Sequence, residues 1–135
     1  KSIMNIVKSC SNKNFELSGH ISPEKVKKKM RDASIIVIPS IWDEPFGLVG
    51  AEAMCHGIAI ISSDVGGLSE VIGGKGISIK NINKEKLFFA LNRLLSNPLQ
   101  IKKMQKKSWN SFNFDAKHSS SILDQEREKI SSSFF

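Results

Sequence analysis

Short apolar runs alternate with helical patterns through the middle of the chain. The runs at 34–38 and 58–61 consist almost wholly of Ile, Val and Ala, and a weaker run follows at 77–79. Such runs are typical of strands buried on both faces of a parallel sheet. Helical patterns lie between them at 48–54 and 68–72. The alternation predicts an α/β fold with a parallel sheet flanked by helices.

Further elements are expected on the amino-terminal side of this core. Residues 2–9 have helical spacing, and the segment 15–19 indicates a short strand that runs into a turn at Gly19. Ser22 can cap a helix that opens with Pro23. This helix has an apolar stripe and a Lys-rich face over 24–31, which indicates a solvated surface.

The last third of the chain is expected to be helical. Asn83 can cap a helix with Leu87 and Leu94 on one side, and Asn97 with Pro98 ends it and starts another. A weaker helical pattern extends over 115–130. These helices predict an extension that follows the α/β core.

Composition bounds the class of protein. The 135 residues suit one domain, and 20 Lys and Arg against 13 Asp and Glu give a net charge of +7. Excess Lys can serve phosphorylated ligands, anionic membranes or nucleic acid, and it can also simply keep a protein soluble. Nucleic acid ranks last, because the basic residues follow no recognition motif and are not interleaved with aromatic residues. Contact of the Lys-rich helix with anionic lipid stays open.

Location is predicted from the cysteines and the hydropathy. Cys10 and Cys55 lack CxxC spacing, which indicates reduced thiols in a cytoplasmic protein. No run approaches about 18 apolar residues, so no membrane span is expected. Peripheral contact with the inner face of the membrane is compatible with both observations.

The segment 40–52 is the candidate for chemistry. A buried strand ends at Pro39, and ligands of parallel α/β sheets lie beyond the carboxyl ends of the strands. A helix is expected to begin near Gly47 or Leu48, where its first amides form an anion site suited to phosphate. The carboxylate of Glu52, one turn on, would repel phosphate, but it can accept two hydrogen bonds from a sugar diol.

The same segment resembles a known signature. Glu44 and Glu52 are separated by seven residues, with Pro-Phe-Gly-Leu after the first Glu and Ala-Met after the second. This resembles the E-x7-E motif of retaining glycosyltransferases of the GT-B fold, specifically glycosyltransferase family 4. The resemblance continues through 15–20, 33–40 and 57–70, and it covers about residues 10–95 in order and spacing.

The resemblance implies a role for each matching residue. Glu44 would be the catalytic residue that contacts the donor sugar, and Glu52 would bind the ribose hydroxyls. Other substrate contacts would come from two short segments: Gly19, His20 and Ile21 at the base, and Phe46, Gly47, Leu48 and Val49 at the sugar and diphosphate. The nucleotide diphosphate-sugar would be a substrate, and no metal or other cofactor is expected.

The resemblance also implies how the chain is organised into domains. Residues 1–135 would form one partial nucleotide-sugar-binding domain, the C-terminal half of a GT-B fold, with a Rossmann-like core at about 10–95 and C-terminal helices at about 98–130. The family's Arg and Lys loop and its N-terminal acceptor domain have no match in this sequence. The chain would therefore act as a hexosyltransferase only with an acceptor domain, in cis or in trans. The alternative is a non-catalytic nucleotide-binding or assembly module that forms a homodimer through an open sheet edge.

Several residues leave two interpretations open. Gly66 and Gly67 make a tight turn or match the family's Gly-Gly loop. Trp42 packs on the sheet edge or flanks the sugar. His56 lies near a helix end, where the dipole favours a cation, which points to a structural role.

Overall fold

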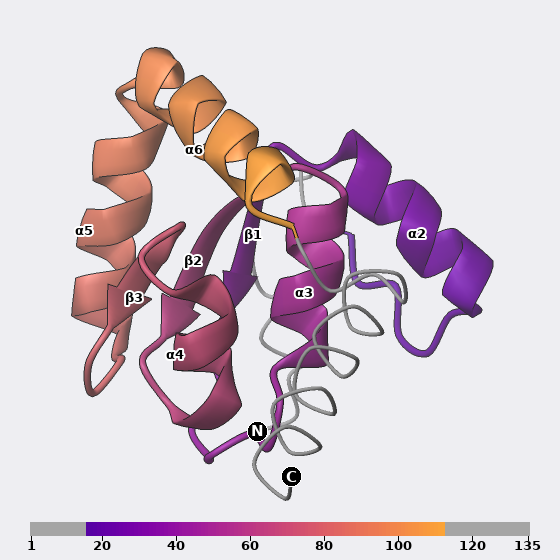
Figure 1. Ribbon diagram of the computed structural model, residues 1–135, viewed down its shortest axis with the longest axis horizontal. Coiled ribbons are helices and arrows are strands. Elements are labelled where there is room, and N and C mark those ends of the chain that lie inside the picture. The colour runs from indigo at the N-terminus through magenta and orange to yellow at the C-terminus, as the bar shows by residue number, and fades with distance from the viewer. Residues whose placement is uncertain (1–15, 113–135) are drawn as a thin grey trace, which may run out of the picture.

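The computed structural model describes residues 16–112 and shows a parallel sheet between two layers of helices (Figure 1). The strands lie in the order β1-β2-β3. Their bounds are Ile35–Ile38 for β1, Ala59–Ser63 for β2 and Ile77–Ile79 for β3. In the register of the sheet, Ile36 of β1 lies beside Ile60 of β2, and Ile61 of β2 lies beside Ile77 of β3. The α/β class and the three central strands are confirmed.

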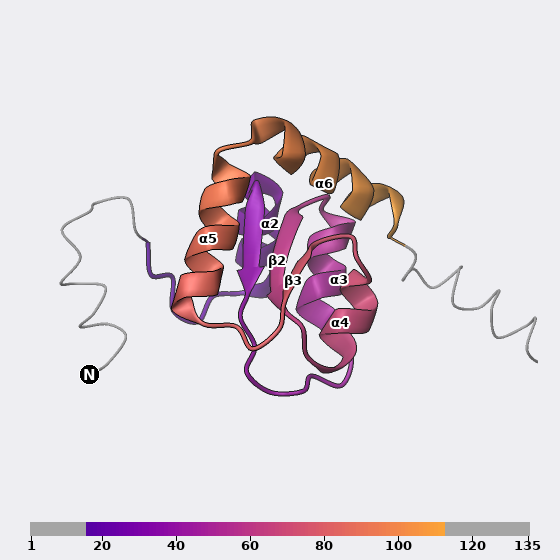
Figure 2. The same ribbon diagram turned by 90° about the vertical axis from the view of Figure 1, so that its left-hand side faces the viewer.

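Helices cover both faces of the sheet (Figure 2). The connections α3 (Leu48–Cys55) and α4 (Gly66–Ile72) lie on one face, as expected for crossovers of one hand in a sheet laid out in chain order. Helix α2 (Pro23–Asp32) packs on the same side. Helices α5 (Lys84–Leu95) and α6 (Pro98–Asn110) cover the other face. The result is a Rossmann-like layer arrangement.

Alternate strand residues supply two apolar cores, because successive side chains point to opposite faces of a sheet. Ile38 and Ile60 belong to the core under α2, α3 and α4. Ala59 and Ile61 belong to the core under α5 and α6. Every residue of β2 is buried, whereas most of β1 is half-buried. The expectation of strands buried on both faces therefore holds for the central strand and only partly for β1, which lies at the edge.

Two local predictions are wrong. Residues 16–19 form no strand, and position 15 lies outside the described residues. A strand needs a neighbour to receive its hydrogen bonds, and residues 16–19 pair with no strand of the described sheet. The Ser22 side chain makes no cap hydrogen bond to α2. The pKa of the Glu24 carboxyl is lowered first by a backbone amide and then by the Ser22 hydroxyl.

The remaining expectations divide by position. The helices expected at 2–9 and 115–130 lie outside the described residues. Within residues 16–112, no helix is long and apolar enough to cross a membrane. Cys55 is a free, exposed thiol, and Cys10 lies outside the described part.

Asn83 caps α5 as the sequence indicates. Its Oδ1 accepts a hydrogen bond from the Lys86 amide at 2.9 Å. Asn83→Ala should therefore lower the free energy of unfolding by about 1 kcal/mol. Asn92→Ala, on an exposed turn inside the same helix, is the matched control and should leave stability unchanged or slightly raised. Urea denaturation of the two variants measures the difference, and equal effects would contradict the capping role.

Candidate functional site

Two loops interlock at the carboxyl edge of the sheet. One follows β1 and carries Glu44, and the other follows β2 and leads into Gly66 and Gly67, the first residues of α4. The Gly67 amide donates a hydrogen bond to the Glu44 carbonyl at 2.7 Å. A Cβ on Gly66 would lie 2.5 Å from that same oxygen, and a Cβ on Gly67 would lie 2.6 Å from the Pro45 carbonyl oxygen. The glycine pair is therefore a contact surface for the Glu44 loop as well as a turn.

Gly47 sets the start of α3. Its backbone is left-handed, with φ 79°, and it is the residue before the helix, which begins at Leu48 as expected. A Cβ at Gly47 would lie 2.7 Å from the Leu68 Cα. Glycine is required here twice, because of the positive φ and because of the close approach of α4.

The first turn of α3 offers amides at the surface. The helix ladder begins with the Gly50 amide, which donates to the Gly47 carbonyl at 2.9 Å. Among the described residues, the amides of Leu48 and Val49 donate to no carbonyl. Both side chains are exposed, at 66% and 42%. This end of α3 has the geometry of an anion site.

Glu44 is held within its loop. Its side chain is half-buried, and the Ser40 hydroxyl donates a hydrogen bond to its Oε1. Ser40 lies just after the end of β1. Its hydrogen bond therefore holds the Glu44 carboxylate near the end of the strand. A charged acceptor in such a position can bind a hydroxyl of a ligand above the sheet edge.

Three predicted residues meet in one cavity. His20, Ile21 and Glu52 line a hollow of about 390 Å³ between α2 and α3. His20 and Ile21 come from the segment before α2, and Glu52 comes from the exposed side of α3. Residues more than 30 positions apart in the sequence therefore face a single space, as the resemblance implies for base and ribose contacts.

The other predicted residues lie around this cavity. Gly19 forms a left-handed turn, with φ 61°, directly before His20. Phe46 lines a separate hollow of about 140 Å³ together with Gly67. Glu44 and Phe46 do not line the larger cavity, so the candidate site has two parts, a cavity and an adjoining loop.

Sequence reasoning missed Lys27, Met30 and His56, which also line the larger cavity. His56 lies one helical turn after Glu52, and its Nδ1 is 2.8 Å from the Glu52 carbonyl oxygen. That spacing was the available signal. Lys27 was assigned to a solvated face, and it is exposed while it also borders the cavity.

Trp42 lies on the loop before Glu44. Its side chain is 61% exposed, and its neighbour Ile41 is 89% exposed. This exposure excludes close packing of Trp42 on the sheet edge.

Among residues 16–112, no group of three or more His, Cys, Asp or Glu could hold a metal ion.

A salt bridge fixes the segment that carries His20. The Lys29 Nζ lies 2.8 Å from the Glu16 Oε1, which ties the chain before the turn to α2. The hydrogen bond from Lys29, followed by its charge, holds the pKa of the Glu16 carboxyl below its usual value. The contact is exposed and therefore positions the segment more than it stabilises the fold.

The parallel sheet between two layers of helices is Rossmann-like and matches a domain of the GT-B type. Residues 1–110 match the model of the family described as glycosyl transferases group 1, so the chain belongs to that family. A sucrose-phosphate synthase from Thermosynechococcus elongatus has a similar structure, with a TM-score of 0.65 and 27% sequence identity. The likeness covers 87% of this chain and 30% of that one.

Relatives of known sequence agree with the family. An uncharacterized glycosyltransferase of Methanocaldococcus jannaschii is 38% identical over 80 residues, which are 58% of this chain and 20% of the relative. A D-inositol 3-phosphate glycosyltransferase of Nocardia farcinica is 32% identical over 84 residues, or 61% of this chain and 18% of the relative. The chain thus spans about a fifth of the length of these relatives.

Proposed function

We propose that this chain forms the donor-binding part of a retaining glycosyltransferase of family 4. The observation that carries the proposal is the shared cavity of His20, Ile21 and Glu52, in which Glu52 lies one turn after the start of α3 at Leu48. A base against the backbone at 19–21, and a ribose whose hydroxyls donate to the Glu52 carboxylate, would fit this arrangement. The diphosphate would then reach the amides of Leu48 and Val49.

The sugar would lie over the loop that carries Glu44. Transfer breaks the bond between the anomeric carbon and the diphosphate oxygen, which leaves with the electron pair. The acceptor hydroxyl forms the new bond to the anomeric carbon and passes its proton to the leaving diphosphate. Amides aimed at the leaving diphosphate stabilise the charge that develops there, which is the principal electrostatic contribution to such a reaction. Glu44, fixed by Ser40, would hold the hexose beside this centre.

The proposed reaction needs no metal or other cofactor, because the positive end of α3 can serve the diphosphate. It does need an acceptor domain, in cis or in trans, since the described residues provide only a donor surface. Several apolar side chains on that surface are exposed, with Trp42 at 61%, Phe46 at 46% and Leu48 at 66%. A face of this kind suits a cleft that a second domain closes. We place the complete enzyme in the cytoplasm, with peripheral membrane contact as an option.

One observation favours a second function, that of an assembly module. Strand β1 pairs with β2 on one side only, and the described residues provide no partner for its other side. Its residues Ile35, Ile36 and Val37 are half-buried rather than buried. An open, apolar edge can pair with a second copy of the chain.

Calorimetric titration with UDP, GDP and their sugar conjugates tests the donor site. Glu52→Gln removes the ribose acceptor's charge at constant size and should weaken binding about tenfold or more, because charge-assisted hydrogen bonds are lost. Glu85→Gln is the matched control. Glu85 is an exposed carboxylate on α5 at a distance from the cavity, and its loss should leave binding unchanged.

Two outcomes would count against the donor site. Equal losses in Glu52→Gln and Glu85→Gln would show that net charge, not the cavity, governs binding. No heat with any nucleotide at millimolar concentration, together with sedimentation of the chain as a dimer, would favour the assembly module instead.

A further inference from the structure

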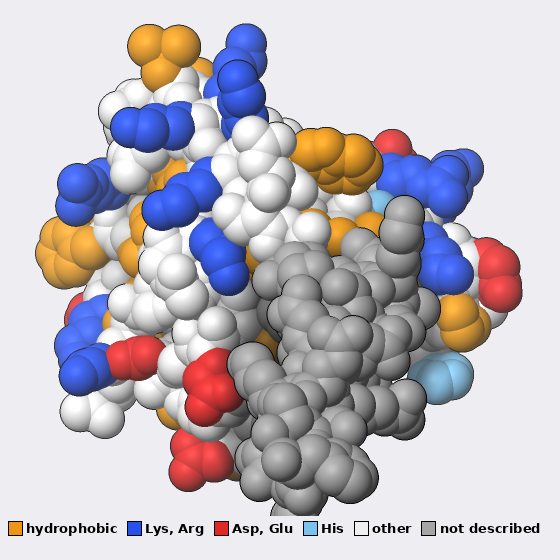
Figure 3. Space-filling view, viewed as in Figure 1, with side chains coloured by type: hydrophobic (Ala, Val, Ile, Leu, Met, Phe, Trp, Pro, Cys, Tyr) orange, Lys and Arg blue, Asp and Glu red, His pale blue; other side chains and the backbone are white. Residues whose placement is uncertain are grey.

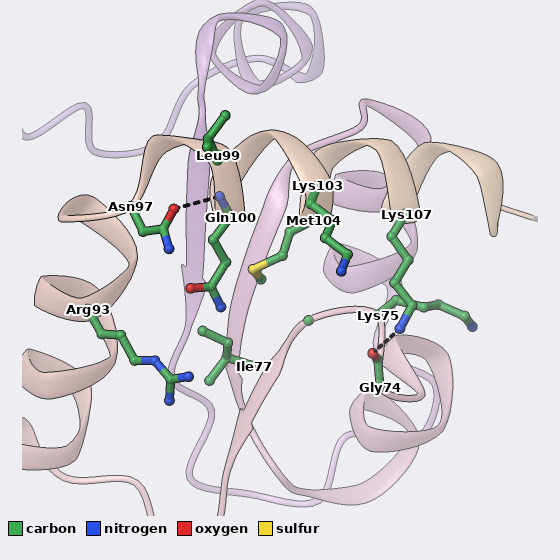
Figure 4. A pocket seen from close by; sticks show the side chains of 11 residues that line it. Gly74, Lys75, Ile77, Arg93, Asn97, Leu99, Gln100, Lys103, Met104 and Lys107 are labelled. Atoms are coloured by element: carbon green, nitrogen blue, oxygen red, sulfur yellow. Dashed lines mark hydrogen bonds between the residues drawn. The ribbon is translucent and has the colours of Figure 1, made fainter.

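A second cavity lies at the opposite end of the sheet. It has a volume of about 600 Å³ and is bordered by the loop at 74–76, the end of α5 and the length of α6 (Figure 4). Residues 74–76 precede β3, whereas the loops of the donor site follow β1 and β2. In a parallel sheet these positions lie at opposite edges. The cavity is therefore separate from the proposed donor site.

Positive charge dominates its lining. Four cations from three elements border the space, and no carboxylate does; these cations are Lys75, Arg93, Lys103 and Lys107. Lys and Arg side chains also gather on this part of the surface, over α5, α6 and the loop before β3 (Figure 3). Like charges brought together around a hollow repel one another, and an anion between them relieves the repulsion.

The cations retain donors for a ligand. Lys107 Nζ donates to the Gly74 carbonyl at 2.9 Å, and Lys75 Nζ donates to the Val71 carbonyl at 3.2 Å. An ammonium has three hydrogens, so two remain on Lys107, whereas the Lys75 side chain extends away from the cavity toward α4 (Figure 4). Within residues 16–112, Arg93 and Lys103 make no hydrogen bond or ion pair. The amino terminus of α6 is not the source of the attraction, because Asn97 already accepts from the Gln100 amide at 3.1 Å.

The rest of the lining is apolar or neutral. Ile77 and Met104 lie at the back of the cavity, and the Gln100 side chain points toward it between Arg93 and Lys103 (Figure 4). A bare inorganic ion would leave this apolar surface uncovered. An organic molecule that carries a phosphate would fill both parts, with its phosphate on the cations and its carbon skeleton on Ile77 and Met104.

We propose that this cavity binds a phosphorylated small molecule at a site distinct from the donor site. The four cations border a concave space that is open to solvent, which suits a compact anion held at the surface by side chains. A membrane surface would instead meet the outer, convex side of α6. Arg93 supplies a planar group for bidentate contact with phosphate, and the lysines supply point charges around it.

Glucose 6-phosphate and inorganic pyrophosphate serve as probes for the complete 135-residue chain. Binding is followed by calorimetry at constant ionic strength, and by the NMR shifts of the Gly74 and Gly76 amides. The double variant Arg93→Gln with Lys103→Gln should weaken glucose 6-phosphate binding roughly tenfold or more. The matched control, Lys102→Gln with Lys106→Gln, removes the same charge from exposed positions of α6 that do not line the cavity. It should weaken binding by about twofold or less.

The donor-site variant Glu52→Gln separates this proposal from the previous one, because it should leave glucose 6-phosphate binding and the Gly74 shift intact. Three results would overturn the proposal. They are equal losses in both double variants, shifts that are confined to residues 47–52, or attachment to phosphatidylglycerol vesicles without binding of either soluble phosphate. Thermal unfolding of each variant confirms that the comparison is made between folded proteins.

Discussion

Gly47→Ala should lower the free energy of unfolding by about 3 kcal/mol, one of the largest effects of any single methyl group in this chain. A left-handed backbone costs an alanine about 1 kcal/mol or slightly more. The added Cβ would also lie 2.7 Å from the Leu68 Cα, a backbone atom that cannot rotate away. Forcing α3 and α4 apart to admit the methyl costs about 1–3 kcal/mol more. Urea denaturation with linear extrapolation measures the total.

Gly74→Ala isolates the conformational part of this effect. Gly74 has φ 72°, close to that of Gly47, and a Cβ there would meet nothing within 4 Å. Its expected loss of about 1 kcal/mol is that of the backbone alone. If the two alanine variants were equally stable, the close approach of the α3 start to α4 would not be a constraint, and the account of the site given above would be wrong.

Leu68→Ala should also lower the free energy of unfolding by about 3 kcal/mol, within the range of about 2–5 kcal/mol for buried leucines. Leu68 is fully buried and belongs to the core under α2, α3 and α4. A Cβ on Gly50 would lie 3.0 Å from its Cδ1, so α3 passes directly over it. Chemical denaturation measures the loss, which is a large fraction of the stability that is usual for a small domain.

Leu99→Ala is the control for that substitution. The Leu99 side chain is 79% exposed on α6, so its removal should change stability by less than about 0.5 kcal/mol. Because Gly47 and Gly50 pack against Leu68, Leu68→Ala should also weaken nucleotide binding at the proposed donor site, and Leu99→Ala should not. A loss of stability in both variants alike would show that α6, rather than the packing under the loops, limits the fold.

Sequence patterns predicted the middle of this fold well, because burial and periodicity coincide there. The apolar run at 58–61 overlaps β2, which has neighbours on both sides in the described sheet, and Asn83 and Asn97 cap their helices as their side chains allow. The segment at 15–19 shows the limit of this reasoning. A strand depends on a partner strand, and local alternation contains no information about whether a partner is present.

The site was predicted in part. The spacing of Glu44 and Glu52 located the loop and the helix, and the structure brings Glu52 to His20 and Ile21. The fit of Gly67 against Pro45 could not be read from the chain, because it joins two segments whose distance in space depends on the packing of α3 and α4. The basic cavity has the same origin. Arg93 and Lys75 resemble any other surface cations until α6 brings them around one hollow.

The interlocked loops have a consequence for engineering. The loop that carries Glu44 packs closely against Gly66 and Gly67, so its backbone conformation does not depend on its own sequence alone. A graft of residues 40–47 alone from another member of the family would lack the Gly66 and Gly67 contacts that this loop packs against. Chimeras that exchange the Glu44 loop therefore need to move the segment from Ser40 to Leu68 as one cassette, with both loops taken from the same parent.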